Sequence, residues 1–331
     1  MQEGGGAKAP PPFCQCDNVK RMDFYGLDLK RVCMFDSVPN VRGLEYEQQT
    51  GVHVRDHILD IRQGIDEPTW TLDYQRIESR ADLWAGLSKL AESKFETPTI
   101  VHLECHGHLE CHGSADGIRQ GCGQSRRWLD ALQLANGDLI TWAELTPRLR
   151  SLNQSTRNNL GLVVAACIGL QTIETVLGSI TEGTPFRWVV GPAEKVYPTP
   201  LEKAMFAFYS SLLAHQQVDV AVASAREQSQ SFQLLTCERL FIEACKKSFL
   251  FNPSSKRKSV EAMVADGLTV YPELSGSSGL YRIAKEALTP PEVEKHLSQW
   301  KRSFFMLDRF PEIEREVAFI TPDYISGLSG K

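Results

Sequence analysis

Short apolar runs and amphipathic stretches alternate along the first two-thirds of this chain. Five segments have the length and hydrophobic pattern of strands, namely residues 31–36, 53–61, 100–105, 160–166 and 187–190. The run at 160–166 is apolar at every position, which is typical of a central parallel strand covered by helices on both faces.

Helical spacing separates these runs. Ser79 with Asp82, and Thr141 with Glu144, have the spacing of a capping box at a helix N-terminus. A third helix is expected around Pro200, because a proline in the first turn loses no hydrogen bond. The alternation predicts an α/β fold: a right-handed β-α-β series with a mostly parallel central sheet and helices on both faces.

The pattern changes after Gln228. Residues 234–251 and 292–305 have the spacing of amphipathic helices, and the basic stretch NPSSKRK between them reads as a solvated loop. We therefore expect a flexible Gly/Pro-rich leader at residues 1–17, an α/β domain at residues 18–228 and a helical extension at residues 229–331 packed on it.

Composition narrows the classes of function. The 331 residues are 42% hydrophobic with a net charge of −5, and no basic face stands out, so we expect no nucleic-acid partner. Apolar runs are too short for a membrane span and the N-terminus lacks a signal pattern, so we expect no membrane association. Nine cysteines, an odd number, fit a reducing compartment, and we expect a cytoplasmic protein.

Two strand ends have the residue types of a thiol hydrolase. The strand at 100–105 leads into His-Gly pairs, and the strand at 160–166 leads directly into Cys167. Carboxyl ends of parallel strands meet at one sheet edge, with neighbouring strands about 5 Å apart. A histidine there can take the thiol proton and later protonate a leaving amine. We predict Cys167 as the nucleophile, its thiolate favoured by a helix expected at 171–177.

These blocks, in this order, resemble the CHAT group of caspase-like proteases. Within residues 99–225 the matching motifs are CHGSADGI, GDLITWAEL, LGLVVAACIG, VVGP and AFYSSLL. The resemblance implies a caspase-hemoglobinase sheet, a Cys-His dyad that cleaves peptide bonds, and an oxyanion hole formed by the amides of Gly113 and Cys167. It also implies that Asp36 and Arg42 lie where such folds bind the substrate's specificity side chain, whereas the residues themselves favour a surface turn at both positions.

The identity of the base is left open because the hexapeptide HLECHG occurs twice in tandem, at residues 102–107 and 108–113. His112 keeps the downstream CHGSADGI context, and we choose it as the base. His106 directly follows the strand at 100–105 and is the alternative. The repeat length is even, so either copy preserves the alternation of a strand.

The same repeat gathers four histidines and two cysteines, as a metal site would. Its spacings, C-x5-C and H-x5-H, match no usual zinc pattern, and successive residues of a strand point to opposite faces. We therefore expect no metal site and no cofactor.

Two classes of function remain. The first is a cysteine endopeptidase that cleaves a protein or peptide substrate and is regulated by a partner protein or by self-cleavage in the loop at 119–138. The second is a caspase-like module with little or no catalysis that serves as a protein-interaction scaffold. The presence of both the cysteine and the histidine favours the first class, the endopeptidase, because a scaffold needs neither. By analogy, the resemblance suggests regulated proteolysis in defence or cell death.

Overall fold

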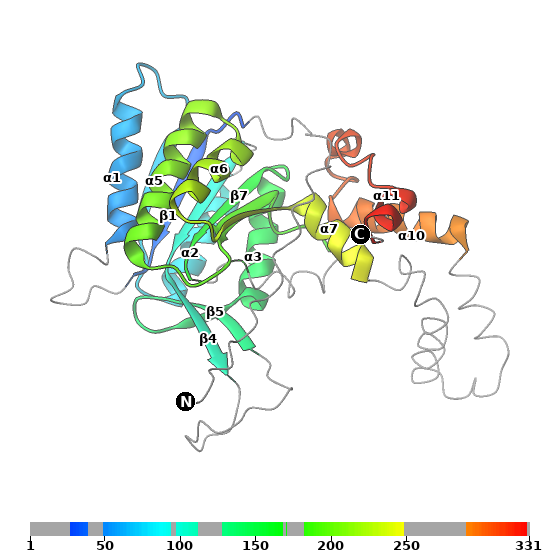
Figure 1. Ribbon diagram of the computed structural model, residues 1–331, viewed down its shortest axis with the longest axis horizontal. Coiled ribbons are helices and arrows are strands. Elements are labelled where there is room, and N and C mark those ends of the chain that lie inside the picture. The colour runs from blue at the N-terminus through cyan, green and yellow to red at the C-terminus, as the bar shows by residue number, and fades with distance from the viewer. Residues whose placement is uncertain are drawn as a thin grey trace, which may run out of the picture.

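A six-stranded sheet forms the centre of the protein in this computed structural model, which describes residues 27–38, 49–93, 97–111, 128–167, 170, 182–247 and 289–329. The strand order is β2-β1-β3-β7-β8-β9. Figure 1 labels β1 and β7 of this sheet. The strands are β1 Arg31–Asp36, β2 Thr71–Arg76, β3 Thr99–Glu104, β7 Leu160–Ala165, β8 Trp188–Pro192 and β9 Phe232–Thr236. All neighbouring pairs are parallel except β8 with β9, which confirms the predicted mostly parallel α/β sheet.

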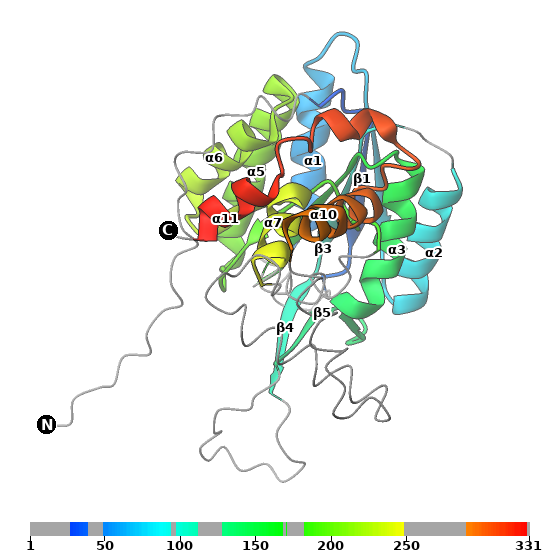
Figure 2. The ribbon, with the colours of Figure 1, turned by 90° about the vertical axis from the view of Figure 1, so that its right-hand side faces the viewer.

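Helices cover both faces of this sheet. One face packs against α1 Thr50–Gln63, α5 Pro198–His215 and α6 Val218–Gln228; the other packs against α2 Arg80–Glu92, α3 Trp142–Ser155 and α7 Cys237–Lys247. Figure 2 shows α5 and α6 on one side and α2 and α3 on the other. Successive residues of β3 therefore enter opposite cores: Ile100 faces α1 and α5, and Val101 faces α2 and α3.

The starts of α2, α3 and α5 follow from local sequence. The Ser79 hydroxyl accepts the Asp82 amide at 3.3 Å and the Asp82 carboxylate accepts the Ser79 amide at 2.9 Å, so the predicted capping box is confirmed. Thr141 and Glu144 make the same reciprocal pair at α3. α5 begins at Pro198, two residues before the expected proline.

Two expectations for the first hundred residues are wrong. Residues 53–61, predicted as a strand, lie in α1, because Val54, Ile58 and Ile61 share one helical face packed against the sheet. The second strand is instead β2, an edge strand whose sequence, TLDYQR, has only one strongly apolar side chain. An edge strand with one solvated face needs few apolar residues, so hydrophobic pattern alone does not reveal it.

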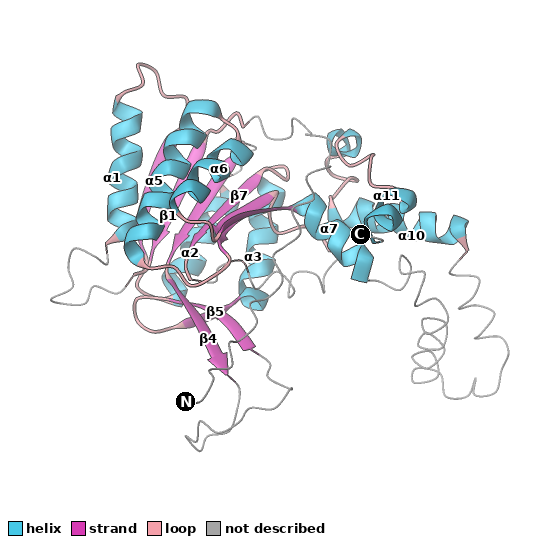
Figure 3. Ribbon diagram, in the orientation of Figure 1, coloured by secondary structure: helices cyan, strands magenta, loops and turns pink. Residues whose placement is uncertain are grey.

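A small antiparallel sheet, which the sequence pattern did not predict, leaves the carboxyl edge of the central sheet (Figure 3). Its strands are β4 His106–Cys111, β5 Trp128–Gln133 and β6 Leu139–Thr141. β4 begins only two residues after β3 ends, and it pairs with β5 along all six of its residues. The second copy of the hexapeptide thus starts inside this small sheet.

The C-terminal helices share a core with the central sheet. Beyond α7 these are α10 Pro290–Phe304, the 3-10 helix η4 Pro311–Arg315 and α11 Pro322–Ser329, gathered at one end of the molecule (Figure 1). The helix predicted at 292–305 corresponds to α10. The one predicted from residue 234 begins later, because β9 extends the sheet beyond residue 228. Residues 1–17 lie outside the described part, within which no helix is long and apolar enough to span a bilayer.

We predict that Ile58→Ala lowers the free energy of unfolding by about 2–4 kcal/mol, because it empties a fully buried site between α1 and the sheet. Asp60→Ala, at an exposed position of the same helix, serves as the control and should change stability by less than about 0.5 kcal/mol. Urea denaturation of the two variants measures both effects. Equal effects at the two positions would contradict the orientation of α1.

Candidate functional site

Three neighbouring strands, β1, β3 and β7, end together at the carboxyl edge of the sheet. In the register, Asp36 pairs with Glu104 and Glu104 pairs with Ala165, so the residues that follow each strand emerge side by side. The Cys105 amide extends the ladder by one bond, to the Ala165 carbonyl at 3.4 Å. The two strand ends selected from the sequence, before His106 and before Cys167, therefore lie next to each other.

Gly107 lies directly against the main chain of Cys167. A Cβ placed on Gly107 would overlap the Cys167 carbonyl oxygen and would lie 2.7 Å from its carbon, so this position accepts no side chain without a backbone shift. His106, which precedes Gly107, is exposed. The described structure thus brings the first copy of the hexapeptide to Cys167. His112, Gly113, Arg42 and the helix expected at 171–177 lie outside the described residues.

The structure describes the side chains of five cysteines, and among these five Cys167 alone is partly exposed. Its Sγ donates to the carbonyl of Val196 at 3.3 Å, on the segment that leads from β8 into α5. The other four, Cys33, Cys105, Cys237 and Cys245, are buried. Burial raises the pKa of the Cys33 and Cys245 thiols to about 12, and raises the pKa of the Cys105 and Cys237 thiols as well. Cys167 is therefore the described thiol best suited to react.

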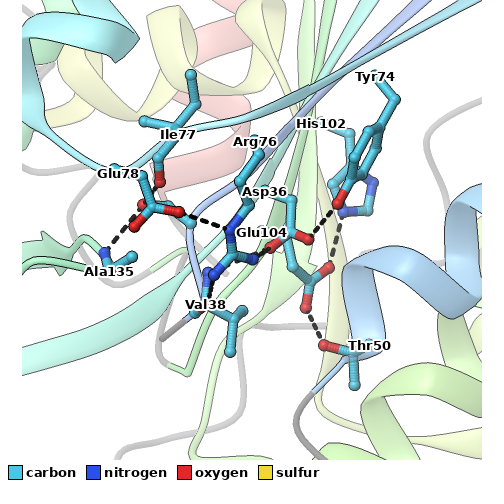
Figure 4. Close-up of polar contacts among 11 residues, drawn as sticks. Asp36, Val38, Thr50, Tyr74, Arg76, Ile77, Glu78, His102, Glu104 and Ala135 are labelled. Atoms are coloured by element: carbon cyan, nitrogen blue, oxygen red, sulfur yellow. Dashed lines mark hydrogen bonds and ion pairs between the residues drawn. The ribbon is translucent and has the colours of Figure 1, made fainter. Parts of the chain in front are cut away.

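Asp36 reaches the same edge but is turned into the protein (Figure 4). Asp36 is 1% exposed, and its carboxylate accepts hydrogen bonds from the Arg76 guanidinium at 2.9 Å, the Tyr74 hydroxyl at 2.6 Å and the Val38 amide at 3.2 Å. Arg76 also donates to the Val38 carbonyl. Both carboxylate oxygens have partners within the chain, so Asp36 links the end of β1 to β2 at this sheet edge.

A second polar cluster at this edge escaped sequence reasoning. His102 and Glu104 are buried on the same face of β3, and Glu104 also bonds to Thr50 at the start of α1 (Figure 4). His102 further bonds to Tyr209 of α5 at 2.8 Å. The sequence held a signal: two polar residues alternate with apolar ones in a strand that helices cover on both sides.

The described residues offer no group of three or more His, Cys, Asp or Glu side chains arranged to hold a metal ion. What they offer is a partly exposed thiol and an exposed histidine, one residue from a glycine that packs on the main chain of the thiol-bearing residue. This arrangement suits nucleophilic attack by a thiol on a carbonyl carbon.

No protein-family model matches the chain, and no curated protein matches it. Among solved structures, the chain is similar to a secreted C11 cysteine protease from Bacteroides thetaiotaomicron, solved with an irreversible peptide inhibitor (TM-score 0.40, 11% identity, covering 78% of this chain and 81% of that one). It is also similar to the Drosophila initiator caspase Dronc (TM-score 0.38, 8% identity, 71% of this chain and 91% of that one). At these levels of overlap and identity, neither similarity bears on the chemistry of this chain.

We predict that brief treatment of the native protein with iodoacetamide at pH 8 alkylates Cys167 and spares Cys33, Cys105, Cys237 and Cys245. The raised pKa values keep the four buried thiols protonated at this pH, and only thiolates react. Peptide mass spectrometry measures the labelling, and a denatured sample, in which all five react, is the control. Labelling of Cys33 as fast as Cys167 would contradict the described burial.

The two copies of the hexapeptide allow a matched steric test. Gly107→Ala should lower the free energy of unfolding by roughly 1–3 kcal/mol or more, because the new methyl group overlaps the Cys167 main chain. Gly113→Ala makes the same change in the same local sequence and should have a smaller effect. Thermal and urea unfolding compare the two. A larger loss from Gly113→Ala would mean that the second copy lies at Cys167.

Proposed function

We propose that this protein is a caspase-like cysteine endopeptidase of the CHAT type, which cleaves peptide bonds in a protein substrate with Cys167 and a histidine of the HLECHG repeat. The observation that carries the proposal is the packing of Gly107 on the Cys167 main chain, at a sheet edge where the thiol is partly exposed. The motif blocks that resemble CHAT proteases support it independently.

The proposed base is His106. It takes the proton of the Cys167 thiol, and the sulfur attacks the scissile carbonyl carbon to form a tetrahedral intermediate. The amides of Gly107 and Cys167 donate to the oxyanion. When the intermediate collapses, the C–N bond breaks and the imidazolium protonates the leaving amine. Water, deprotonated by the same imidazole, then hydrolyses the thioester and regenerates the thiol.

Two observations favour His106 over His112. The first is the contact of Gly107 with Cys167. The second is the cost of the alternative: sliding the chain by six residues to bring the second copy to the strand end would replace Ile100 and Val101, both buried in β3, by His106 and Gly107. Such a shift loses two apolar side chains from opposite cores and buries an imidazole in exchange. Accordingly, Gly107 takes the oxyanion role first assigned to Gly113.

The remaining parts of the proposal concern substrate and setting. Asp36, held by Arg76 and Tyr74, shapes the edge beside the dyad, and Arg42 contributes to recognition of the substrate side chain next to the scissile bond. The protease acts in the cytoplasm, in a regulated defence or cell-death pathway, after activation by a partner protein or by self-cleavage.

Cleavage of a mixed peptide library, followed by mass spectrometry, tests the activity directly. Cys167→Ala should abolish cleavage, a loss of several powers of ten in rate, and leave the circular dichroism spectrum unchanged. Cys111→Ala is the matched thiol control and should keep most of the activity. Cleavage by well-folded Cys167→Ala protein above a few per cent would refute the nucleophile. A folded wild-type protein that neither cleaves peptides nor reacts with a peptidyl acyl electrophile would support the scaffold function instead.

The repeat itself provides a second test of the site. Deleting residues 102–107 and deleting residues 108–113 give the same polypeptide, in which Val101 is followed by one complete HLECHG. This single-copy protein keeps β3, His106 and Gly107, and loses residues 108–111 of β4, which pair with β5 in the small sheet. It should therefore retain activity. Loss of activity in a folded single-copy protein would show that both copies contribute to catalysis.

A further inference from the structure

Two inward-facing positions near the end of β3, His102 and Glu104, carry polar side chains, whereas a strand in the core of a protein is normally apolar. His102 is 0% exposed and Glu104 is 1% exposed, and both lie on the face that β3 presents, at Ile100, to α1 and α5. Burying an ionisable pair at such a position costs free energy unless every polar atom is bonded. A polar pair here needs a reason other than stability.

The hydrogen bonds of this cluster form one continuous chain. Burial, and then the charge of Glu104, raise the pKa of Tyr209 well above its ordinary value, so the phenol stays protonated, and its oxygen is hydrogen-bonded to Nδ1 of His102 at 2.8 Å. Nε2 of His102 is hydrogen-bonded to one oxygen of Glu104 at 2.9 Å, and the Thr50 hydroxyl donates to the other. Every polar side-chain atom of the four residues has a partner.

The main chain of Glu104 is held as firmly as its side chain. Its carbonyl accepts the Ser37 amide at 2.8 Å, and the next amide, of Cys105, bonds to the Ala165 carbonyl. The first turn of α1 closes over the cluster: a Cβ on Gly51 would lie 2.7 Å from Cγ of Asp36, the cross-strand neighbour of Glu104. This positive end of a helix dipole favours the two carboxylates beneath it.

These bonds immobilise the last residue of β3, two residues before His106. Strand ends ordinarily fray, whereas this one is fixed from three elements: α5 through Tyr209 and His102, α1 through Thr50, and the end of β1 through Ser37. A displacement of about 1 Å in a catalytic group costs about a hundredfold in rate. A rigid strand end therefore matters most directly before a base.

We propose that His102 and Glu104, braced by Thr50 and Tyr209, are positioning residues that align His106 with the Cys167 thiol. The proposal rests on the proposed function, since it assigns the buried cluster to the same dyad. None of the four needs to touch the substrate; they act through the backbone of residues 105–107.

Thr50→Val tests this role by removing one hydroxyl donor with almost no change in shape. We expect kcat to fall roughly ten- to a hundredfold with KM little changed, and the pH at which Cys167 alkylation by iodoacetamide is half-maximal to rise, because a misaligned imidazolium stabilises the thiolate less. Thr50→Ser, which keeps the donor, should restore both values.

Thr99→Val is the matched control. Thr99 is also buried, lies at the opposite end of β3, and donates its hydroxyl to the Thr97 carbonyl at 3.0 Å. The variant should lower the melting temperature as Thr50→Val does, while kcat and the alkylation profile stay as in the wild type. Tyr209→Phe, which removes the hydroxyl that is hydrogen-bonded to His102, gives a second variant should Thr50→Val fail to fold.

Equal kcat values and equal alkylation profiles for Thr50→Val and Thr99→Val would overturn the positioning role and leave a purely structural cluster. Wild-type protein that cleaves nothing, with Cys167 reacting like an ordinary free thiol, would overturn the proposed function and the positioning role with it. The two failures are distinguishable, because the first leaves the wild-type activity intact and the second is seen in the wild type alone.

Discussion

The close approach of Gly107 to the main chain of Cys167 is the constraint around which the rest of the site is arranged. Backbone can approach backbone so closely only where no Cβ intervenes, so a glycine must stand at this point. The approach joins the end of β3 to the end of β7, which are already neighbours in the sheet. It also fixes which part of the repeated sequence lies at the thiol, since the residue before that glycine is His106.

Buried charge is the second feature of this edge. Asp36 and Glu104, which are cross-strand neighbours, are both buried. The Arg76 guanidinium is hydrogen-bonded to the Asp36 carboxylate, whereas the Thr50 hydroxyl and the His102 ring are hydrogen-bonded to the Glu104 carboxylate. The start of α1 covers both. An edge stabilised in this way is costly to rearrange, because removing one partner leaves an uncompensated buried carboxylate. The strand ends that precede His106 and Cys167 are therefore held rigidly.

The sequence was most informative where one physical effect dominates. The continuous run of apolar residues at 160–166 predicted a buried strand, and the paired residues of the two capping boxes predicted the starts of α2 and α3. It was least informative where tertiary context decides. α1 was mistaken for a strand, because Val54, Ile58 and Leu59 fit either period over so short a stretch. β2 was missed because an edge strand needs few apolar residues, and β9 because it continues into a helix.

The candidate site, too, has one feature that local sequence predicts and one that depends on tertiary context. That a His-Gly strand end and the strand end before Cys167 meet at one sheet edge followed from the predicted parallel sheet, and the structure has β3 beside β7. The choice between two identical hexapeptides did not follow, because even spacing makes the copies equivalent to any local rule. What separates them is the burial of Ile100 and Val101 upstream and of His102 and Glu104 within the first copy, and burial depends on the fold as a whole.

The central claim, that the first copy provides the catalytic histidine, is tested most directly by comparing the kcat of His106→Ala with that of His112→Ala on one cleaved peptide. The two substitutions are chemically identical and lie in identical hexapeptides, so any difference reports position. The account predicts that His106→Ala loses at least about a hundredfold in kcat, as removal of a general base does, while His112→Ala stays within a few-fold of wild type. A severe loss from His112→Ala, with His106→Ala nearly unaffected, would contradict it.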